Sequence, residues 1–487
     1  MGFPLSNDPA IVWFRQDLRI ADNRALSAAA ASGQPVIALY ILDDETPGEW
    51  RMGGASRWWL HHSLASLTAD LDGLDAQLIL RTGNAADVLK DVVSQTQATA
   101  VHWNRLYEPY AIARDKDVKA DLQAMDIEVT SYNASLLFEP WTAKTKTGGP
   151  YRVFSPFWRN CMRELDAPDH PKSAPKKLTS LKDRPASDTL EDWHLLPTKP
   201  DWAGGLEEQW SPGATGAAAR LDRFLDKAAG GYKEGRDMPG IDGTSGLSPH
   251  LHFGEISPRH VYWAARAHAD EYPAHSKSVD KFVAELGWRE FAYHLLYHFP
   301  SIPTDNYQDK FDDFPWREDA DGLAAWQQGM TGYPMVDAGM RQLWQTGWMH
   351  NRVRMIVASF LAKHLMVHWR EGESWFWDTL VDADLAANAA SWQWVAGSGA
   401  DAAPYFRIFN PITQGNKFDP DGDYVRKYVP ELAKLPNKYL FSPWTAPDDV
   451  LDQAGIVLGT DYPRPIVDHS DARERALGGY SDIKKAS

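Results

Sequence analysis

The sequence predicts an α/β domain at the amino-terminal end, followed by a mostly helical domain. Short β-rich runs alternate with helical runs over residues 9–133. From about residue 216 to 435, the apolar residues recur with helical spacing and strand signals are sparse. With 487 residues, the chain is also longer than one hydrophobic core usually supports. We therefore expect two domains of different architecture.

The first domain is expected to contain a five-stranded parallel sheet. The strands are predicted over residues 10–15, 35–42, 76–82, 99–104 and 127–133, with helical runs between them. This alternation requires right-handed crossovers, which place helices on both faces of a parallel sheet. No G-x-G-x-x-G motif follows the first strand, so the sequence places no dinucleotide in this Rossmann-like domain.

The second domain begins after a long connection. Residues 166–205 are rich in Pro, Lys, Asp and Ser, which is typical of an inter-domain linker. We expect the α/β domain at 1–135, the linker at 136–215 and the helical domain at 216–487. Helices are predicted over residues 217–229, 258–270, 277–297, 322–329, 337–346, 351–367 and 423–434. The polar residues from about 455 to 487 are expected to form a short, loose surface tail.

Composition narrows the class of protein. The single cysteine, Cys161, excludes an internal disulfide framework and a thiolate-held iron–sulfur cluster. It favours a reducing compartment, so we expect a cytoplasmic protein. The amino-terminal residues lack the pattern of a signal peptide, and no apolar run reaches membrane-spanning length. A net charge of −16 means that any DNA-binding face must be a local basic patch.

Two features of the second domain are unusual for an ordinary core. The chain has 22 Trp, which serve either core packing or one-electron transfer. Between residues 333 and 410, four charged side chains interrupt strongly apolar sequence: Arg352, Arg354, Asp382 and Asp384. Buried charge is costly unless it is paired or holds a ligand. A large flat ligand with polar edges, such as a flavin, would explain both the charges and the aromatic residues.

Several long motifs share one resemblance. They occupy residues 13–26, 244–259, 288–291, 331–343, 347–355, 368–373, 382–394 and 401–411. Together they resemble the photolyase/cryptochrome family over residues 9–435, and cyclobutane pyrimidine dimer DNA photolyases most closely. Residues 138–158 and 288–300 resemble the class III branch, the relatives of plant cryptochromes. The resemblance implies a helical domain that holds FAD in a folded-back conformation.

The resemblance implies a set of FAD-binding residues. Arg354 and Asp382 resemble the pair beside the isoalloxazine, where an arginine stabilises a reduced, anionic flavin. Hydroxyls and backbone N–H groups at residues 244–248 suit a phosphate, although an N-cap and turn would explain them equally. The full set is Tyr232, Thr244, Ser245, Gly246, Leu247, Ser248, Arg354, Asp382, Asp384 and Asn388. Many relatives carry a larger, often basic residue in place of Gly246.

Asn388 matches the family position that faces flavin N5. An amide can accept a hydrogen bond from N5–H or donate one to N5, but it cannot deliver a proton. A carboxylic acid could, as Asp does in plant-type cryptochromes. Asn388 therefore favours a repair enzyme over a sensor, whereas an isolated Asn is more often a helix cap. Trp392, Trp369 and Trp316 match the family's electron-transfer chain, although each alone would be read as core.

The resemblance also implies a lesion pocket and a DNA-gripping rim. Trp288 and Trp394 would wall two splayed pyrimidines, Glu285 and Asn351 would bind their edges, and Met355 would pack against them. The (6-4) enzymes place a histidine pair near Asn351 and Met355, so that chemistry does not fit. Four arginines resemble the phosphate-gripping rim, and each alone would be read as a solvated surface residue: Arg236, Arg289, Arg352 and Arg407.

The activity implied is light-driven repair of cyclobutane pyrimidine dimers in DNA by a monomer that uses no metal. A folate antenna, 5,10-methenyltetrahydrofolate, is expected, but Tyr110 and Ala111 replace the Asn-Glu pair of the best-known folate-binding branch. A blue-light sensor would share the fold, the flavin and the tryptophans. Asn388, the lesion pocket and the short tail disfavour a sensor. A flavin electron carrier leaves Trp288, Met355 and the arginines unexplained.

Overall fold

The computed structural model describes residues 8–181, 183–402 and 406–486. They form two compact units. The first contains residues 1–226 and 245–300, and the second contains residues 227–244 and 301–487. The sequence-based domain limits at 135 and 215 stay a prediction. The expected absence of a signal peptide concerns residues 1–7, which lie outside the described ranges, as do residues 403–405 of the motif at 401–411.

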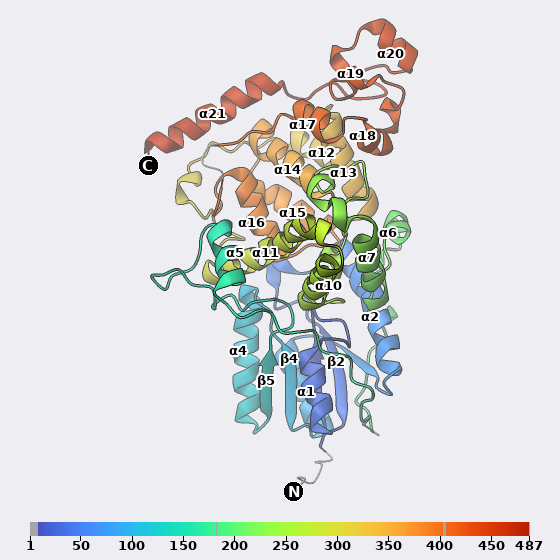
Figure 1. The fold of residues 1–487 in the computed structure, drawn as a ribbon, viewed down its shortest axis with the longest axis vertical. Coiled ribbons are helices and arrows are strands. Elements are labelled where there is room, and N and C mark those ends of the chain that lie inside the picture. Colours follow the sequence, from blue (N-terminus) through green and yellow to red (C-terminus); the bar gives the residue numbers. More distant parts are fainter. Residues whose placement is uncertain (1–7, 182, 403–405, 487) are drawn as a thin grey trace. The chain divides into compact units, whose positions relative to one another are not determined.

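The first unit is built on a parallel sheet (Figure 1). Its strands are β1 (Ala10–Phe14), β2 (Val36–Leu42), β3 (Leu78–Thr82), β4 (Ala100–Asn104) and β5 (Glu128–Tyr132). All four pairings are parallel, in the order β3-β2-β1-β4-β5, which confirms the predicted sheet. Every residue of β1, β2 and β4 is buried, as expected for strands covered on both faces.

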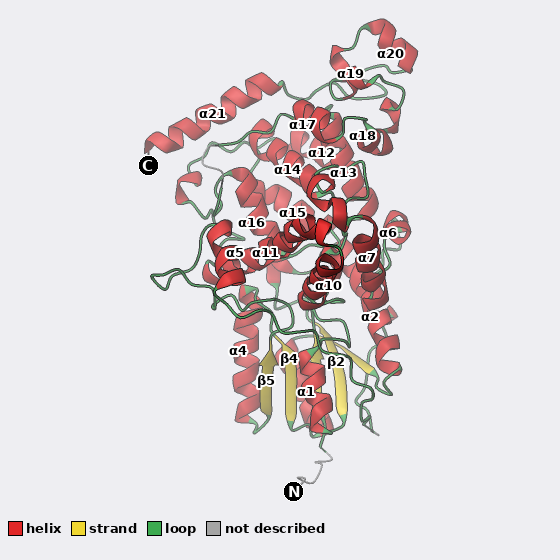
Figure 2. Cartoon of the chain, in the orientation of Figure 1, coloured by secondary structure: helices red, strands yellow, loops and turns green. Residues whose placement is uncertain are grey.

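Helices of the first unit cover the sheet and continue beyond it. They are α1 (Arg24–Ser32), α2 (Gly54–Asp72), α3 (Ala85–Thr96), α4 (Pro109–Ala124), α5 (Phe154–Arg163), α6 (Gly204–Gln209), α7 (Ala214–Lys227), α9 (Ser248–His252), α10 (Pro258–Glu271) and α11 (Ser276–His298). Odd-numbered strand residues such as Ile11 and Ile37 pack against α3 and α4, whereas α1 contacts β1, β4 and β5. Figure 2 shows the strands gathered in this one sheet.

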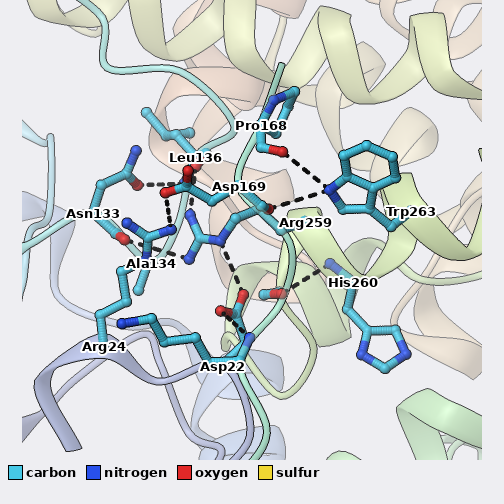
Figure 3. A network of polar contacts seen from close by, with 12 residues as sticks. Asp22, Arg24, Asn133, Ala134, Leu136, Pro168, Asp169, Arg259, His260 and Trp263 are labelled. Atoms are coloured by element: carbon cyan, nitrogen blue, oxygen red, sulfur yellow. Dashed lines mark hydrogen bonds and ion pairs between the residues drawn. The ribbon is translucent and has the colours of Figure 1, made fainter. Parts of the chain in front are cut away.

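A buried polar network joins α10 to the loops around the sheet (Figure 3). Arg259 is 2% exposed, and its Nε donates to Asp22 Oδ2 at 3.0 Å. Its two terminal nitrogens donate to the carbonyl oxygens of Leu136 and Asn133, both at 3.3 Å. Trp263 Nε1 donates to Pro168 O at 3.1 Å. Asp22 and Arg259 belong to two of the family motifs, and here they hold the first unit together.

The second unit is helical. Its helices are α8 (Tyr232–Gly235), α12 (Ala320–Gln328), α13 (Pro334–Thr346), α14 (Asn351–Ser359), the π-helical segment η6 (Phe360–Leu365), α15 (Trp369–Thr379), α16 (Leu385–Ala396), α17 (Pro411–Phe418), α18 (Asp423–Tyr428), α19 (Asn437–Leu440), α20 (Asp448–Ala454) and α21 (His469–Ala486). The helix expected over 351–367 therefore changes to π-helical geometry after Ser359. Among the described residues, no helix combines the length and apolar character needed to cross a bilayer.

The carboxy-terminal residues differ from the loose tail that the sequence predicted. Residues 469–486 form α21, which packs on η6. Ala472, Ala476 and Ile483 are buried, and His469 Nδ1 lies 2.8 Å from His364 Nε2. The composition of this segment is polar because most of its surface faces water, and the few apolar residues that dock the helix were too sparse to be recognised.

Candidate active site

The second unit brings Arg354 of α14 together with Asp382, which lies just before α16. Arg354 Nη2 donates to Asp382 Oδ1 at 3.0 Å and to Oδ2 at 2.8 Å. Its Nε donates to the carbonyl oxygen of Met349 at 2.8 Å. Asp382 is 8% exposed, so the carboxylate offsets the charge of the arginine in a poorly hydrated setting. This arrangement holds a guanidinium in a fixed orientation.

Two further polar residues lie on α16 and are both buried. Asp384 is the N-cap of the helix, and its carboxylate accepts from the Ala387 N–H at 2.8 Å. Asn388 lies one turn later, so it is not a helix cap. Its Nδ2 donates to the carbonyl oxygen of Glu373 on α15 at 3.0 Å. This hydrogen bond fixes the amide and uses a donor, which leaves the amide oxygen to accept from a ligand.

The expected phosphate-binding residues are divided between the two units. Tyr232 begins α8 in the second unit and is buried. The guanidinium carbon of Arg236 lies over its ring, 5.7 Å from the ring centroid. Thr244 is the last residue of the segment 227–244, which belongs to the same unit. Residues 245–248 belong to the first unit. There the Leu247 N–H donates to Ser245 Oγ at 3.3 Å, which is the turn that the sequence left as an alternative, and Ser248 begins α9.

Gly246 needs the conformational freedom of glycine. Its φ is +63°, a left-handed conformation that costs other residues free energy. A Cβ at this position would lie 2.6 Å from Arg220 Nη1. Arg220 is positioned by stacking on Trp210, with its guanidinium 4.1 Å from the ring centroid. The space that a larger residue at position 246 would need is therefore filled by an arginine from α7.

The three tryptophans of the expected electron-transfer chain lie in the second unit. Trp392 is buried against Phe376, at a centroid distance of 5.0 Å. Trp369 is also buried, and its Nε1 donates to Asn306 Oδ1 at 2.9 Å. Trp316 is half-buried. The ring of His368 lies 4.8 Å from that of Trp316 and 5.5 Å from that of Trp369. Sequence reasoning missed His368, although it directly precedes Trp369.

The expected lesion residues form one group in each unit. Glu285 and Trp288 lie one turn apart on α11, in the first unit. Trp288 is 37% exposed and stacks on Phe154 at 3.8 Å, so one face of the indole is fixed while part of it stays accessible. Lys281 Nζ lies 3.1 Å from Glu285 Oε1. The use of both groups in one pocket stays a prediction.

In the second unit, Asn351 and Met355 lie one turn apart on α14, and Asn351 is exposed. Trp394 on α16 is half-buried, and its Nε1 donates to Asp401 O at 3.0 Å. His350 caps α14, because its Nδ1 accepts from the Arg352 N–H at 3.2 Å. Burial lowers the pKa of His350 to about 4, so the ring is neutral at physiological pH and can serve as this acceptor.

Asp237 brings two of the four expected rim arginines together. Arg352 Nη2 donates to Asp237 Oδ1 at 2.9 Å, and Arg236 Nε lies 3.9 Å from the same oxygen. Sequence reasoning missed this carboxylate, which reduces the positive charge of the pair. Arg407 is exposed and lies over the ring of Phe409 at 4.6 Å.

The fourth rim arginine, Arg289, lies in the first unit. Its Nη1 donates to Ser135 O at 2.7 Å. Within the described residues, no cluster of three or more His, Cys, Asp or Glu could hold a metal ion.

Comparisons with known proteins place these residues in a family. Residues 10–176 match the family described as DNA photolyase, and residues 282–482 match the FAD binding domain of DNA photolyase. The chain is 55% identical to a deoxyribodipyrimidine photo-lyase of Agrobacterium fabrum, over 99% of this chain and 100% of the relative. This chain belongs to the DNA photolyase family.

Other relatives agree with this assignment. The photolyase chain superimposes on the crystal structure of a bacterial class III photolyase from Agrobacterium tumefaciens with a TM-score of 0.95 and 54% identity, covering 100% of this chain and 99% of the other. This chain is also 40% identical to cryptochrome-2 of Arabidopsis thaliana, over 98% of this chain and 79% of the cryptochrome. The photolyase therefore carries the FAD-binding domain that the sequence predicted. Arg354, Asp382, Asp384 and Asn388 all lie within it.

Proposed function

We infer that this chain is a deoxyribodipyrimidine photo-lyase, which repairs pyrimidine dimers in DNA with light. The observation that carries this conclusion is the 55% identity, over the full length of both chains, to a deoxyribodipyrimidine photo-lyase. When bound, reduced FAD supplies the electron that light drives into the dimer, whose ring opens before the electron returns. The protein's own residues hold the cofactor, present the lesion and tune the charge between them.

Four residues of the second unit support a binding site for the flavin ring there. The buried carboxylate of Asp382 pairs with the partly exposed Arg354 and holds its positive charge in place, which favours an electron-rich ring. Asn388 presents an amide oxygen that can accept from a ring N–H, and Asp384 is buried beside it on α16. These donors and acceptors fit the polar edge of an isoalloxazine. Residues 244–248 and Tyr232 are proposed to bind the phosphates.

We propose that the exposed aromatic and amide groups bind the lesion. Trp288 is stacked on Phe154 and partly accessible, which suits a wall for splayed pyrimidines. Glu285, Asn351, Met355 and Trp394 complete the proposed pocket. Arg407 and Arg352 are proposed to bind DNA phosphates, together with Arg236 and Arg289. The pairing of Arg236 and Arg352 with Asp237 supports a role in fixing geometry as well as charge.

We propose that Trp392, Trp369 and Trp316 carry electrons to the flavin from the protein surface. Two observations support this. The tryptophans change from buried to half-buried along the series, and His368 contacts both Trp369 and Trp316. Trp369 and Trp316 are therefore linked through ring contacts with one histidine.

The remaining proposals concern the second chromophore and the state of the protein. The likeness to a class III photolyase structure supports membership of that branch. We also propose the folate antenna, 5,10-methenyltetrahydrofolate, that the sequence resemblance implies. Ala111 is buried in α4, so it offers no polar group for the antenna. We also propose a monomer in the cytoplasm, where the buried thiol of Cys161 stays reduced.

The test is repair by the purified, FAD-loaded and chemically reduced protein. A dimer-containing oligonucleotide is illuminated with the protein, and the remaining dimers are counted against a dark control. We expect loss of dimers only in the light. Unchanged dimers with normal flavin photoreduction would indicate a cryptochrome-like sensor instead. Glu285→Ala is expected to weaken repair while FAD stays bound, and loss of FAD from that variant would contradict the proposed pocket.

A further inference from the structure

Lys363 is a buried lysine without an acidic partner among the residues that the structure describes. It lies in the π-helical segment η6 and is 1% exposed. Burial lowers the pKa of its ammonium group to about 7, and no neighbouring charge opposes this effect. A lysine is an expensive residue to bury in this way, because an apolar side chain of the same length would fill the space without desolvating a charge.

Within the described residues, Nζ of Lys363 makes a hydrogen bond and a cation–π contact with one short segment, residues 406–409. Its Nζ donates to the carbonyl oxygen of Arg407 at 3.3 Å. The same nitrogen lies 3.4 Å from the centroid of the Phe406 ring. A cation over the face of an aromatic ring is attracted to it, and a neutral amine is not. The contact therefore holds the segment more strongly when Lys363 is protonated.

The segment 406–409 contains both buried and exposed side chains. Phe406 and Phe409 are buried, and Arg407 between them is exposed. The Phe409 N–H donates to Ser359 Oγ at 3.2 Å, and Tyr480 of α21 stacks on Phe406 at 4.6 Å. The hydrogen bond from Lys363 is made to the backbone of Arg407 itself. Lys363 also lines a small pocket together with Trp394 and Arg407.

We propose that Lys363 is a positioning residue of the repair site, whose ammonium group fixes the backbone of residues 406–409 so that Arg407 projects towards a DNA phosphate. This proposal rests on the proposed function, in which Arg407 binds DNA. Lys363 does not touch the DNA; it acts through Arg407 and the adjoining wall of Trp394.

Among the described charged and titratable groups around Lys363, its own ammonium group is the one that changes charge near neutral pH. Arg407 and, from α21, Tyr480 line the same pocket, whereas α16 contributes the uncharged Trp394 and Val395. His364, next on η6, faces His469 and accepts from Arg475 through its carbonyl oxygen. Burial lowers the pKa of His364 to about 3, so it stays neutral. No charged group of α12, α14 or α15 in the described ranges shifts Lys363.

The experiment compares the wild type with Lys363→Met, which keeps the length of the side chain without the charge. The dissociation constant for a dimer-containing oligonucleotide is measured with FAD-loaded protein between about pH 6 and about pH 8.5. We expect Lys363→Met to bind about ten-fold more weakly at the acidic end, and the ratio to approach one at the alkaline end, where the wild type has lost its own ammonium charge.

Two further variants separate the causes. Lys363→Gln keeps a donor for the Arg407 carbonyl but has no charge, so its affinity should match that of Lys363→Met and should lack the wild-type pH dependence. Lys434→Met removes an exposed charge of the same unit, and it should leave the pH dependence of the wild type intact.

Three outcomes would overturn the proposal: equal affinity of Lys363→Met and wild type near pH 6, a ratio that does not vary with pH, or loss of FAD from Lys363→Met. Wild-type protein that fails to bind dimer DNA above undamaged DNA would instead contradict the proposed function.

Discussion

Asn388 shows how one side chain is set by its neighbours in space. Its amide nitrogen donates to the carbonyl oxygen of Glu373, so the residue is held by a backbone group from another helix. An amide suits this position because it offers a donor to the carbonyl and an acceptor to a ligand at the same time. A carboxylate offers acceptors only.

We predict that Asn388→Asp introduces a carboxyl group that keeps its proton at neutral pH. An ionised carboxylate would face the Glu373 carbonyl oxygen across 3.0 Å in a buried site, which raises the carboxyl pKa. A group whose pKa is higher in the folded state than in the unfolded state stabilises the protein fully at low pH, and this stabilisation is lost as the pH rises. The free energy of unfolding of the variant should therefore fall by about 1–3 kcal/mol, relative to that of the wild type, between mildly acidic and mildly alkaline pH.

Chemical unfolding of both proteins across this pH range measures the effect, and net proton uptake on illumination provides a second readout. A constant stability difference at all pH values would show that the introduced carboxyl does not face the carbonyl.

We predict that Gly246→Ala destabilises the loop before α9. The φ of +63° costs an alanine about 1 kcal/mol. Its Cβ would also displace the Arg220 guanidinium from Trp210. Thermal unfolding and the FAD content after purification measure both effects. Gly204→Ala is the matched control, because a Cβ there meets nothing within 4 Å. Equal melting temperatures for the two variants would contradict the expected strain.

At the scale of elements, α21 is a docked helix and part of the second unit's core. Ile483 is 3% exposed and packs in a cluster with Phe311 and Phe314. Phe314 in turn contacts Trp316, at a centroid distance of 4.6 Å. The last helix of the chain therefore supports the region that we propose as the surface end of the electron-transfer chain.

We predict that Ile483→Ala lowers the free energy of unfolding by about 2–4 kcal/mol, because it removes buried methyl groups and leaves a cavity. Lys484→Ala, at the exposed neighbouring position, should change it by less than about 0.5 kcal/mol. Urea unfolding followed by tryptophan fluorescence measures both. A similar small effect for the two variants would mean that α21 is undocked in solution.

Trp316→Phe should slow photoreduction of the flavin, since phenylalanine keeps the contact with Phe314 but is much harder to oxidise than indole. Repair by chemically pre-reduced protein should continue at the wild-type rate, because the relay is not needed there. Trp444→Phe is the control, as Trp444 packs on Tyr333 and contacts none of the three relay tryptophans among the ring contacts of the described residues. Unchanged photoreduction in Trp316→Phe would count against the relay.

At the scale of the whole molecule, buried histidines govern how the stability of the folded protein changes as the pH falls. Burial lowers the pKa of His294 and His350 to about 4 and that of His364 to about 3. Unfolding restores an ordinary pKa, so between about pH 6.5 and about pH 4 the unfolded chain binds more protons. Stability therefore falls as the pH falls through this window. Glu290 opposes the trend, because burial raises its pKa to about 7.

We predict that the melting temperature falls on acidification from about pH 6.5 to about pH 4.5, since the lowered pKa values of these three histidines outweigh the raised pKa of Glu290. His350→Asn should reduce this dependence, because asparagine keeps a helix-capping acceptor without a titratable ring. The difference in unfolding free energy between the ends of the range should shrink by about 1–3 kcal/mol in the variant. An unchanged pH dependence would show that His350 is solvated in the native state.

The sequence by itself determined the fold class, the five strands and most helices, because hydrophobic periodicity is a local property that each segment carries alone. It also determined the family and the types of residue that the chemistry needs, because those residues occur within long contiguous motifs. Only the tertiary structure decided that Asp237 pairs with Arg352, that His368 contacts two tryptophans, that α21 docks, and that Lys363 is buried. Each of these depends on a contact or an environment created by residues distant in sequence, and both the burial of a charge and its pairing are properties of that assembled environment.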